Sequence, residues 1–162
     1  MRPRSVDEFL RRNRIPYTTL LHPPAFTAMH AAAASHTPGR CFAKTVVCFA
    51  DAEPIFAVVP AHYTIDMERL QVLTGAQALR LALPHEMLAL YPDCEEGAMP
   101  PFGDLYVQRV FLDESLRGEP EMVFNAGTHT DCIRMDYGEF AHVAHPTVGP
   151  FGVRRHWSSW IA

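Results

Sequence analysis

Two apolar segments rich in β-branched and aromatic residues, residues 42–49 and 55–59, constrain the fold of this 162-residue chain most strongly. Side chains of these types fit the pleated surface of a sheet. Between them lies a short polar connection, residues 51–54, which contains a proline and is typical of a turn between strands. We therefore expect a hairpin-like pair of strands with mostly apolar faces, in a chain long enough for one domain with a core of its own.

Helices and strands are predicted to alternate irregularly along the rest of the chain. Ser5 and Glu8 have the spacing of a capping box, Thr27 and Asp66 can cap further helices, and Gly75 can end the helix that Asp66 begins. The pattern predicts helices at residues 6–14, 28–35, 67–73, 85–90 and 137–143, and further strands at residues 17–21, 105–112, 122–125 and 132–135. This order indicates a mixed α/β domain built around one sheet.

The last part of the chain differs from the rest in composition. From Pro146 onward it is rich in Gly, Pro and Trp, and such a composition predicts a segment that docks only loosely. We expect residues 1–148 to form the domain and residues 149–162 to form a C-terminal tail.

Charge and hydropathy exclude several classes of function. The formal net charge is −4, so a general nucleic-acid coat protein is not indicated, and any RNA partner would be held by local patches. No apolar run approaches the roughly 20 residues that a membrane-spanning helix needs. The first residues also lack the apolar stretch of a secretory signal. We expect a cytoplasmic protein with no membrane partner.

No metal ion and no nucleotide cofactor are expected. His22, His30 and His36 lack HxxxH or HxH spacing, and the four cysteines form no CxxC pair. In a cytosolic chain these cysteines are expected to be free and mostly buried thiols. Neither a Walker loop nor a G-x-G-x-x-G motif occurs.

Lys44 is the first residue that indicates chemistry. It stands between core-like residues of the segment 42–49, where an ammonium is costly to bury unless it reaches a cavity, a carboxylate or a ligand anion. The alternative is that strand alternation turns Lys44 outward into solvent. The residues alone leave both interpretations open.

The loop from Gly97 to Gly103 is the second such feature. Pro100 and Pro101 fix its backbone, and the flanking glycines permit a positive φ or the close approach of a ligand. A rigid loop of this kind presents N–H and C=O groups in fixed directions, as an oxyanion hole or an amino-acid clamp requires. The alternative is a tight connection between strands under packing constraint.

His129 is the third feature, in a polar turn at residues 125–130 between two apolar strands. Loops at strand ends often carry function, although a turn histidine can also be merely solvated. No G-x-S-x-G motif is present. Cys94 is flanked by carboxylates, which disfavour a reactive thiolate. A covalent serine or cysteine mechanism is therefore not favoured.

The order and spacing of four motifs resemble the YbaK family, which includes the editing insertion domain of bacterial prolyl-tRNA synthetase. The motifs are HPP at residues 22–24, FAKT at residues 42–45, GxxxPFG at residues 97–103 and NAGTH at residues 125–129. The resemblance extends from about Ser5 to about Val148. It implies a single α/β domain with a curved, barrel-like mixed sheet and surrounding helices.

The resemblance also implies the site residues. It places catalytic roles on Lys44, Gly97, Pro101 and His129. It places substrate-binding roles on Phe26, Thr27, Thr45, Ala98, Met99, Pro100, Phe102, Gly103, Gly127 and Thr128. Thr45 after the lysine is more like the branches that handle cysteinyl, seryl or threonyl errors. The Gly127–His129 turn is closer to the alanine and insertion-domain type, so the amino acid stays open.

The implied activity is trans-editing, in which an ester hydrolase removes a small amino acid such as Ala, Cys, Ser or Thr from mischarged tRNA of the prolyl editing type. The implied partner is the tRNA acceptor end, with an aminoacyl-tRNA synthetase as a further possible partner. The alternatives are a non-catalytic module that binds an aminoacyl group or another small molecule, and a synthetase-associated interaction domain.

Two basic clusters are candidates for RNA contact beyond the acceptor end. They consist of Arg2, Arg4, Arg11, Arg12 and Arg14, and of Arg154, Arg155, His156 and Trp157. Aromatic rings beside arginines suit stacking on unpaired bases. The alternative is a solvated helix end and a tail packed on the body of the protein.

Overall fold

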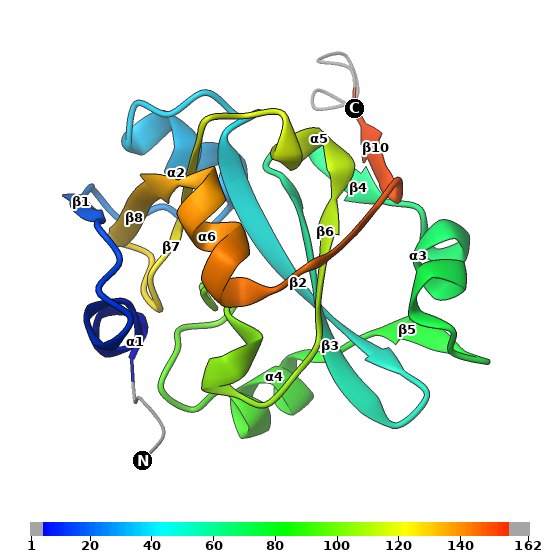
Figure 1. Cartoon of the computed structure of the whole chain (residues 1–162). Helices are drawn as coiled ribbons and strands as arrows, with labels where there is room; N and C mark the ends of the chain where they lie inside the picture. Colours follow the sequence, from blue (N-terminus) through cyan, green and yellow to red (C-terminus); the bar gives the residue numbers. More distant parts are fainter. Residues whose placement is uncertain (1–4, 156–162) are drawn as a thin grey trace.

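An eight-stranded mixed sheet forms the centre of the protein. In the computed structural model, which describes residues 5–155, its strands follow the order β1-β8-β7-β2-β3-β6-β9, with β5 paired to β2. Strands β4 and β10 form a separate two-stranded sheet. Helices surround the main sheet (Figure 1). The structure confirms the predicted single α/β domain with a mixed sheet.

The elements are short apart from the two central strands. The main-sheet strands are β1 (Thr18–Leu21), β2 (Phe42–Ala50), β3 (Glu53–Pro60), β5 (Leu79–Leu81), β6 (Val110–Asp113), β7 (Glu121–Asn125), β8 (Asp131–Asp136) and β9 (Thr147–Gly149). The second sheet pairs β4 (Tyr63–Ile65) with β10 (Gly152–Arg154). The helices are α1 (Val6–Arg12), α2 (Ala28–Ala34), α3 (Met67–Thr74), α4 (Pro84–Leu90), α5 (Glu114–Arg117), α6 (Tyr137–Ala144) and the 3-10 turn η1 (Gly103–Leu105).

The predicted hairpin is confirmed as the antiparallel pair β2–β3. Its register runs from Ala43 opposite Pro60 to Ala50 opposite Glu53, so only Asp51 and Ala52 remain in the turn. The side chain of Asp51 accepts hydrogen bonds from the backbone of residues 77 and 78, which ties the turn to the segment leading into β5. Pairing with β3, β5 and β7 makes β2 the best-connected strand of the sheet.

Both faces of β2 are covered, which explains its apolar sequence. Ala43 and Val47 join the main core, to which α1, α5 and α6 also contribute. Phe42 and Cys48 lie on the opposite face, in two smaller clusters that include residues of α2 and α3 respectively. Because side chains alternate along a strand, Lys44 belongs to this second face, between the Phe42 cluster and the Cys48 cluster.

The predicted strand at residues 105–112 is wrong in its first half. Gly103–Leu105 form a 3-10 turn, and the strand begins only at Val110. The carbonyl of Gly103 accepts hydrogen bonds from the N–H groups of both Tyr106 and Gln108, which curls the chain. Val107 has a φ of +57°, a left-handed conformation that a strand does not contain.

The expectation of a loosely docked segment after Pro146 is also wrong for the residues that the structure describes. Strand β9 pairs in parallel with β6, β10 pairs with β4, and Phe151 between them is completely buried. Three-residue strands separated by glycine and proline show no periodicity, so the sequence pattern does not reveal them.

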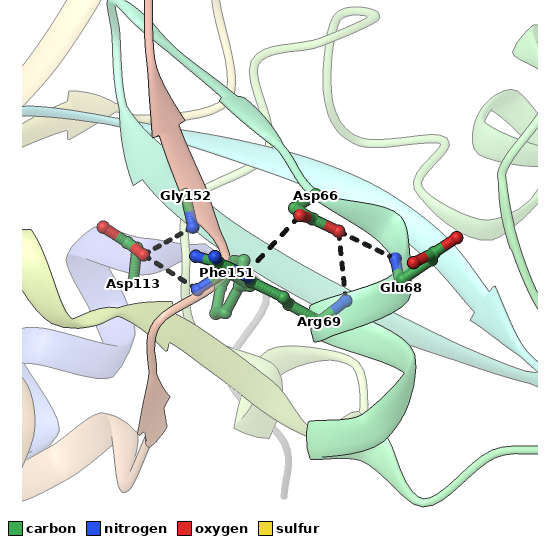
Figure 2. Close-up of polar contacts among 6 residues, drawn as sticks. All are labelled: Asp66, Glu68, Arg69, Asp113, Phe151 and Gly152. Atoms are coloured by element: carbon green, nitrogen blue, oxygen red, sulfur yellow. Dashed lines mark hydrogen bonds and ion pairs between the residues drawn. The ribbon is translucent and has the colours of Figure 1, made fainter.

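Two aspartates that cap helices also hold this C-terminal segment in place, one through its backbone and one through its carboxylate. Asp66 caps α3, and its N–H donates to the carbonyl of Phe151 at 2.8 Å. Asp113 caps α5 and accepts from the N–H groups of Phe151 and Gly152, at 3.1 and 2.6 Å. Figure 2 shows the Asp113 carboxylate directed at the backbone of Phe151 and Gly152, whereas the Asp66 carboxylate faces Glu68 and Arg69 at the start of α3. A Cβ on Gly152 would lie 2.6 Å from Asp113 Cγ, so this close approach requires glycine.

We predict that Asp113→Ala lowers the free energy of unfolding by about 3 kcal/mol, because it removes a helix cap and leaves buried N–H groups without an acceptor. Urea denaturation followed by circular dichroism measures the loss. Asp136→Ala is the matched control, since Asp136 precedes α6 in the same position but makes no capping hydrogen bond through its side chain. Equal losses in the two variants would contradict this account.

Candidate functional site

The glycine–proline loop and the histidine turn are joined by backbone hydrogen bonds. The N–H of Glu95 donates to the carbonyl of Gly127 at 2.8 Å, and the N–H of Gly127 donates to the carbonyl of Ala98 at 2.9 Å. Gly97 and Gly127 have φ values of +80° and +101°, which favour glycine. Two segments that are about 30 residues apart in the sequence therefore form one rigid surface.

The loop becomes progressively more buried along its length. Gly97 is exposed, whereas Ala98, Met99, Pro100 and Pro101 are buried. The amide N–H groups of Gly97 and Met99 donate to no acceptor in the described part of the chain. The loop thus offers two amide donors near its exposed end.

Two of the predicted substrate-binding residues, Phe102 and Gly103, support the fold of the loop. The ring of Phe102 is completely buried against the rings of Phe9, Phe124 and Phe140, with centroids 5.2 to 5.4 Å apart. A Cβ on Gly103 would lie 1.9 Å from the carbonyl oxygen of Gln108, so the turn that ends the loop requires glycine. These residues hold the loop in the core.

His129 is nearly buried beside an exposed aromatic ring. Its side chain packs against Phe26, with ring centroids 5.0 Å apart, and Phe26 is 74% exposed. Its Nε2 lies 3.9 Å from Oε2 of Glu95, two residues before the loop. Its buried Nδ1 has no hydrogen-bond partner among the described residues. A buried polar atom without a hydrogen-bond partner is unusual in a folded protein, which singles out this imidazole.

The segment that carries Phe26 and Thr27 is fixed to the histidine turn. The N–H of His22 donates to the carbonyl of Thr130, and the N–H of Ala25 donates to the carbonyl of His129. The hydroxyl of Thr27 accepts from the N–H of His30 and caps α2. The helix start and the histidine turn therefore lie side by side.

Thr128 stabilises the turn from within. Its hydroxyl donates to the carboxylate of Asp131 and accepts from the N–H groups of Thr130 and Asp131. These contacts engage the hydroxyl inside the turn, which indicates that Thr128 shapes the turn that presents His129.

A buried histidine–cysteine pair that no sequence pattern predicts lies behind this turn. Nδ1 of His22 lies 2.8 Å from the carbonyl of Pro23, which can only accept, so Nδ1 carries the proton. Nε2 of His22 therefore accepts from the thiol of Cys132 at 3.2 Å, and burial raises the pKa of that thiol to about 12. The 110 residues between the two side chains hide the pair from any local pattern.

Lys44 lies on the strand next to the one that carries the histidine turn. Strands β2 and β7 run in parallel, with Phe42 beside Val123. Strand alternation therefore places Lys44 level with Asn125 and on the same face. Lys44 is half-buried, and burial together with the nearby Arg155 lowers the pKa of its ammonium. Within residues 5–155, no carboxylate forms an ion pair with this ammonium.

Thr45 points to the opposite face of the sheet from Lys44. It lies opposite Val58, which belongs to the main core, and it is 8% exposed. Its hydroxyl is buried without a partner in the described chain. The structure therefore separates Thr45 from its neighbour, which sequence adjacency alone does not reveal.

The matched family model is that of the aminoacyl-tRNA editing domain, over residues 22–143. The chain belongs to this family. The match spans all four motifs and confirms the predicted relation to YbaK proteins and to the prolyl-tRNA synthetase insertion domain.

Curated relatives support the same assignment. Proline–tRNA ligases from two strains of Nitratidesulfovibrio vulgaris, Hildenborough and DP4, are 32% and 31% identical to the chain over 104 residues. These residues make up 64% of this chain and 18% of each ligase. The chain therefore matches only about a fifth of the length of these ligases.

Solved structures confirm the fold. The hypothetical protein APE2540 superimposes with a TM-score of 0.83 at 19% identity, over 91% of this chain and 99% of its own. A candidate trans-editing enzyme for prolyl-tRNA synthetase gives a TM-score of 0.75 at 24% identity, over 86% and 87% of the two chains.

Two negative findings apply to residues 5–155. No group of three or more His, Cys, Asp or Glu side chains is placed to hold a metal ion there. No helix within that range is long and apolar enough to cross a membrane. Arg2, Arg4, His156 and Trp157 lie outside the described residues.

We predict that the pKa of dimethylated Lys44 in the protein is lower than the pKa of free dimethyl-lysine. It is the only lysine in the sequence, so reductive methylation with 13C-formaldehyde gives a single side-chain NMR signal. Arg155→Gln should raise the pKa, because it removes a neighbouring positive charge, whereas Arg69→Gln on α3 should leave it unchanged. A wild-type midpoint at or above that of the free amino acid would contradict the prediction.

Proposed function

We propose that this editing domain is an aminoacyl-tRNA deacylase that acts in trans on a small amino acid, such as Ala, Cys, Ser or Thr, attached to a tRNA. The observation that carries this proposal is the joined loop and turn. Backbone hydrogen bonds join the loop, whose Gly97 and Met99 N–H groups have no acceptor among the described residues, to the turn that carries His129.

In the proposed hydrolysis of the aminoacyl ester, each of these groups has a separate task. Water attacks the carbonyl carbon of the aminoacyl ester, the carbonyl oxygen becomes an oxyanion, and the ribose oxygen leaves with a proton from the water. Loop amides directed at the developing oxyanion stabilise it without reorganisation. Pro100 and Pro101 restrict the backbone of the loop, so its donors are preorganised.

Lys44 and His129 bind and position the substrate. The ammonium of Lys44 is matched to the phosphate or ribose of the terminal adenosine, or to the developing negative charge. The imidazole of His129 positions the aminoacyl group, with Phe26, Thr27 and Met99 as walls that limit the size of its side chain. A wall of this kind rejects a larger amino acid by overlap more readily than a smaller one.

A panel of mischarged tRNAs tests the activity. We expect the protein to cleave at least one of the alanyl, cysteinyl, seryl and threonyl esters faster than buffer does, on cognate or non-cognate tRNA. Loss of the ester is followed by acid precipitation of tRNA charged with radiolabelled amino acid. If the protein binds the tRNAs but cleaves none of the esters, it is a non-catalytic binding module.

We predict that Lys44→Ala lowers kcat/KM by about 100-fold or more, since a charged group removed from such a site has an effect of this order. Lys44→Arg should restore part of the activity if charge alone is needed. Arg80→Ala, on the distant strand β5, is the control, and circular dichroism checks that each variant is folded. Full activity in folded Lys44→Ala would remove Lys44 from the mechanism.

A further inference from the structure

A group of cationic side chains lies at the end of β10, where this strand pairs with β4. Arg154 pairs with Tyr63 across the β10–β4 ladder, and the N–H of Arg155 donates to the carbonyl of His62 at 3.1 Å. The backbone therefore fixes both arginines beside the aromatic rings of His62 and Tyr63. We name Lys44, His62, Tyr63, Arg154 and Arg155 the basic ledge.

The charges of the ledge face one another without carboxylates to neutralise them. Arg155 contributes to the lowered pKa of Lys44, and Arg154 and Lys44 add to the effect of burial in lowering the pKa of His62. Six other arginines each pair with a carboxylate within 3.6 Å: Arg12, Arg40, Arg69, Arg80, Arg109 and Arg134. Within residues 5–155, no such pair is found for Lys44, Arg154 or Arg155, nor for Arg11, Arg14 or Arg117. The ledge cations are distinguished by their effect on one another's titration and by the backbone contacts that hold them together. Crowded cations of this kind favour binding of an anion.

The shape of the ledge suits an unpaired nucleic-acid strand. A hollow of about 230 Å³ opens against it, lined in part by His62, Tyr63 and Arg154. Glu119 also lines this hollow, but it pairs with Arg40 at 3.5 Å. The rings of His62 and Tyr63 meet edge to face at 4.8 Å and are only partly buried. Aromatic rings beside cations bind single strands by stacking on bases and by pairing with phosphates.

We propose that the basic ledge binds the unpaired nucleotides of the tRNA 3′ end that precede the terminal adenosine. This inference rests on the proposed function, because it takes Lys44 as the point where the ledge meets the site. The strand leaves the site past Lys44 and continues over His62 and Tyr63 to the two arginines. The ledge thus supplies affinity for the acceptor end, separate from the hydrolytic step.

The test compares charge reversal on the ledge with charge reversal elsewhere. The double variant Arg154→Glu/Arg155→Glu is compared with Arg69→Glu/Arg80→Glu, whose arginines are already paired with carboxylates. The readouts are KM and kcat on the ester that the panel identifies, and the affinity for uncharged tRNA between about 50 and 200 mM KCl. Thermal melting checks folding, and Arg154→Gln/Arg155→Gln removes the charge without reversing it.

We expect the ledge variant to raise KM at least tenfold and to leave kcat within twofold. The slope of log affinity against log salt should fall by about 0.7 for each phosphate that the variant no longer neutralises. Removing the unpaired 3′ nucleotides from the tRNA should weaken binding by the wild type and have little further effect on the variant.

An unchanged KM and salt slope, or an equal effect in the control variant, would contradict the proposal that the basic ledge binds the tRNA 3′ end. So would a fall in kcat at constant KM. Absence of ester cleavage by the wild type would refute the proposed function instead, and the binding of uncharged tRNA would still decide whether the ledge holds RNA.

Discussion

The structure depends on the burial of β2 on both faces. This strand pairs with β3, β5 and β7, and it supplies side chains to the main core and to both smaller clusters. A strand in this position tolerates few polar side chains, because each must find a partner or a cavity. Lys44 lies on the second face between the two smaller apolar clusters. Burial of β2 on both faces, which fixes the sheet, therefore also marks Lys44 as a charged residue that needs a ligand or a cavity.

The site is built from short segments that are rigid for different reasons. Proline restricts the loop, glycine allows its turns, and backbone hydrogen bonds join it to the histidine turn. The pair His22–Cys132 and the bonds from His22 and Ala25 fix the segment before α2 to the same turn. A surface fixed in this way loses little conformational entropy when a substrate binds, which is the condition for catalysis by positioning.

Local sequence patterns predicted what local physics determines. The β2–β3 hairpin, the caps at Ser5, Thr27 and Asp66, and the turn before β8 follow from residue type and spacing. Only the family resemblance put the loop and the histidine turn in one site, since residues 95–98 and 127 are about 30 positions apart and meet only in the folded chain. The patterns missed β9 and β10, which owe their place to Asp113 and Asp66 and not to any periodicity. They also gave no sign of the His22–Cys132 hydrogen bond, because the two residues are 110 positions apart in the sequence.

The chemistry of the thiols supports water as the nucleophile in the proposed reaction. Burial is the first cause that raises the pKa of Cys41, Cys48, Cys94 and Cys132, to about 11 for Cys48 and about 12 for Cys132. All four therefore remain protonated near neutral pH, and a thiol is a far weaker nucleophile than a thiolate. An aminoacyl ester is already activated, so positioned water and preorganised amide donors can supply the remaining acceleration. In the proposed reaction, fixed backbone amide groups and a positioned water therefore act in place of a nucleophilic side chain.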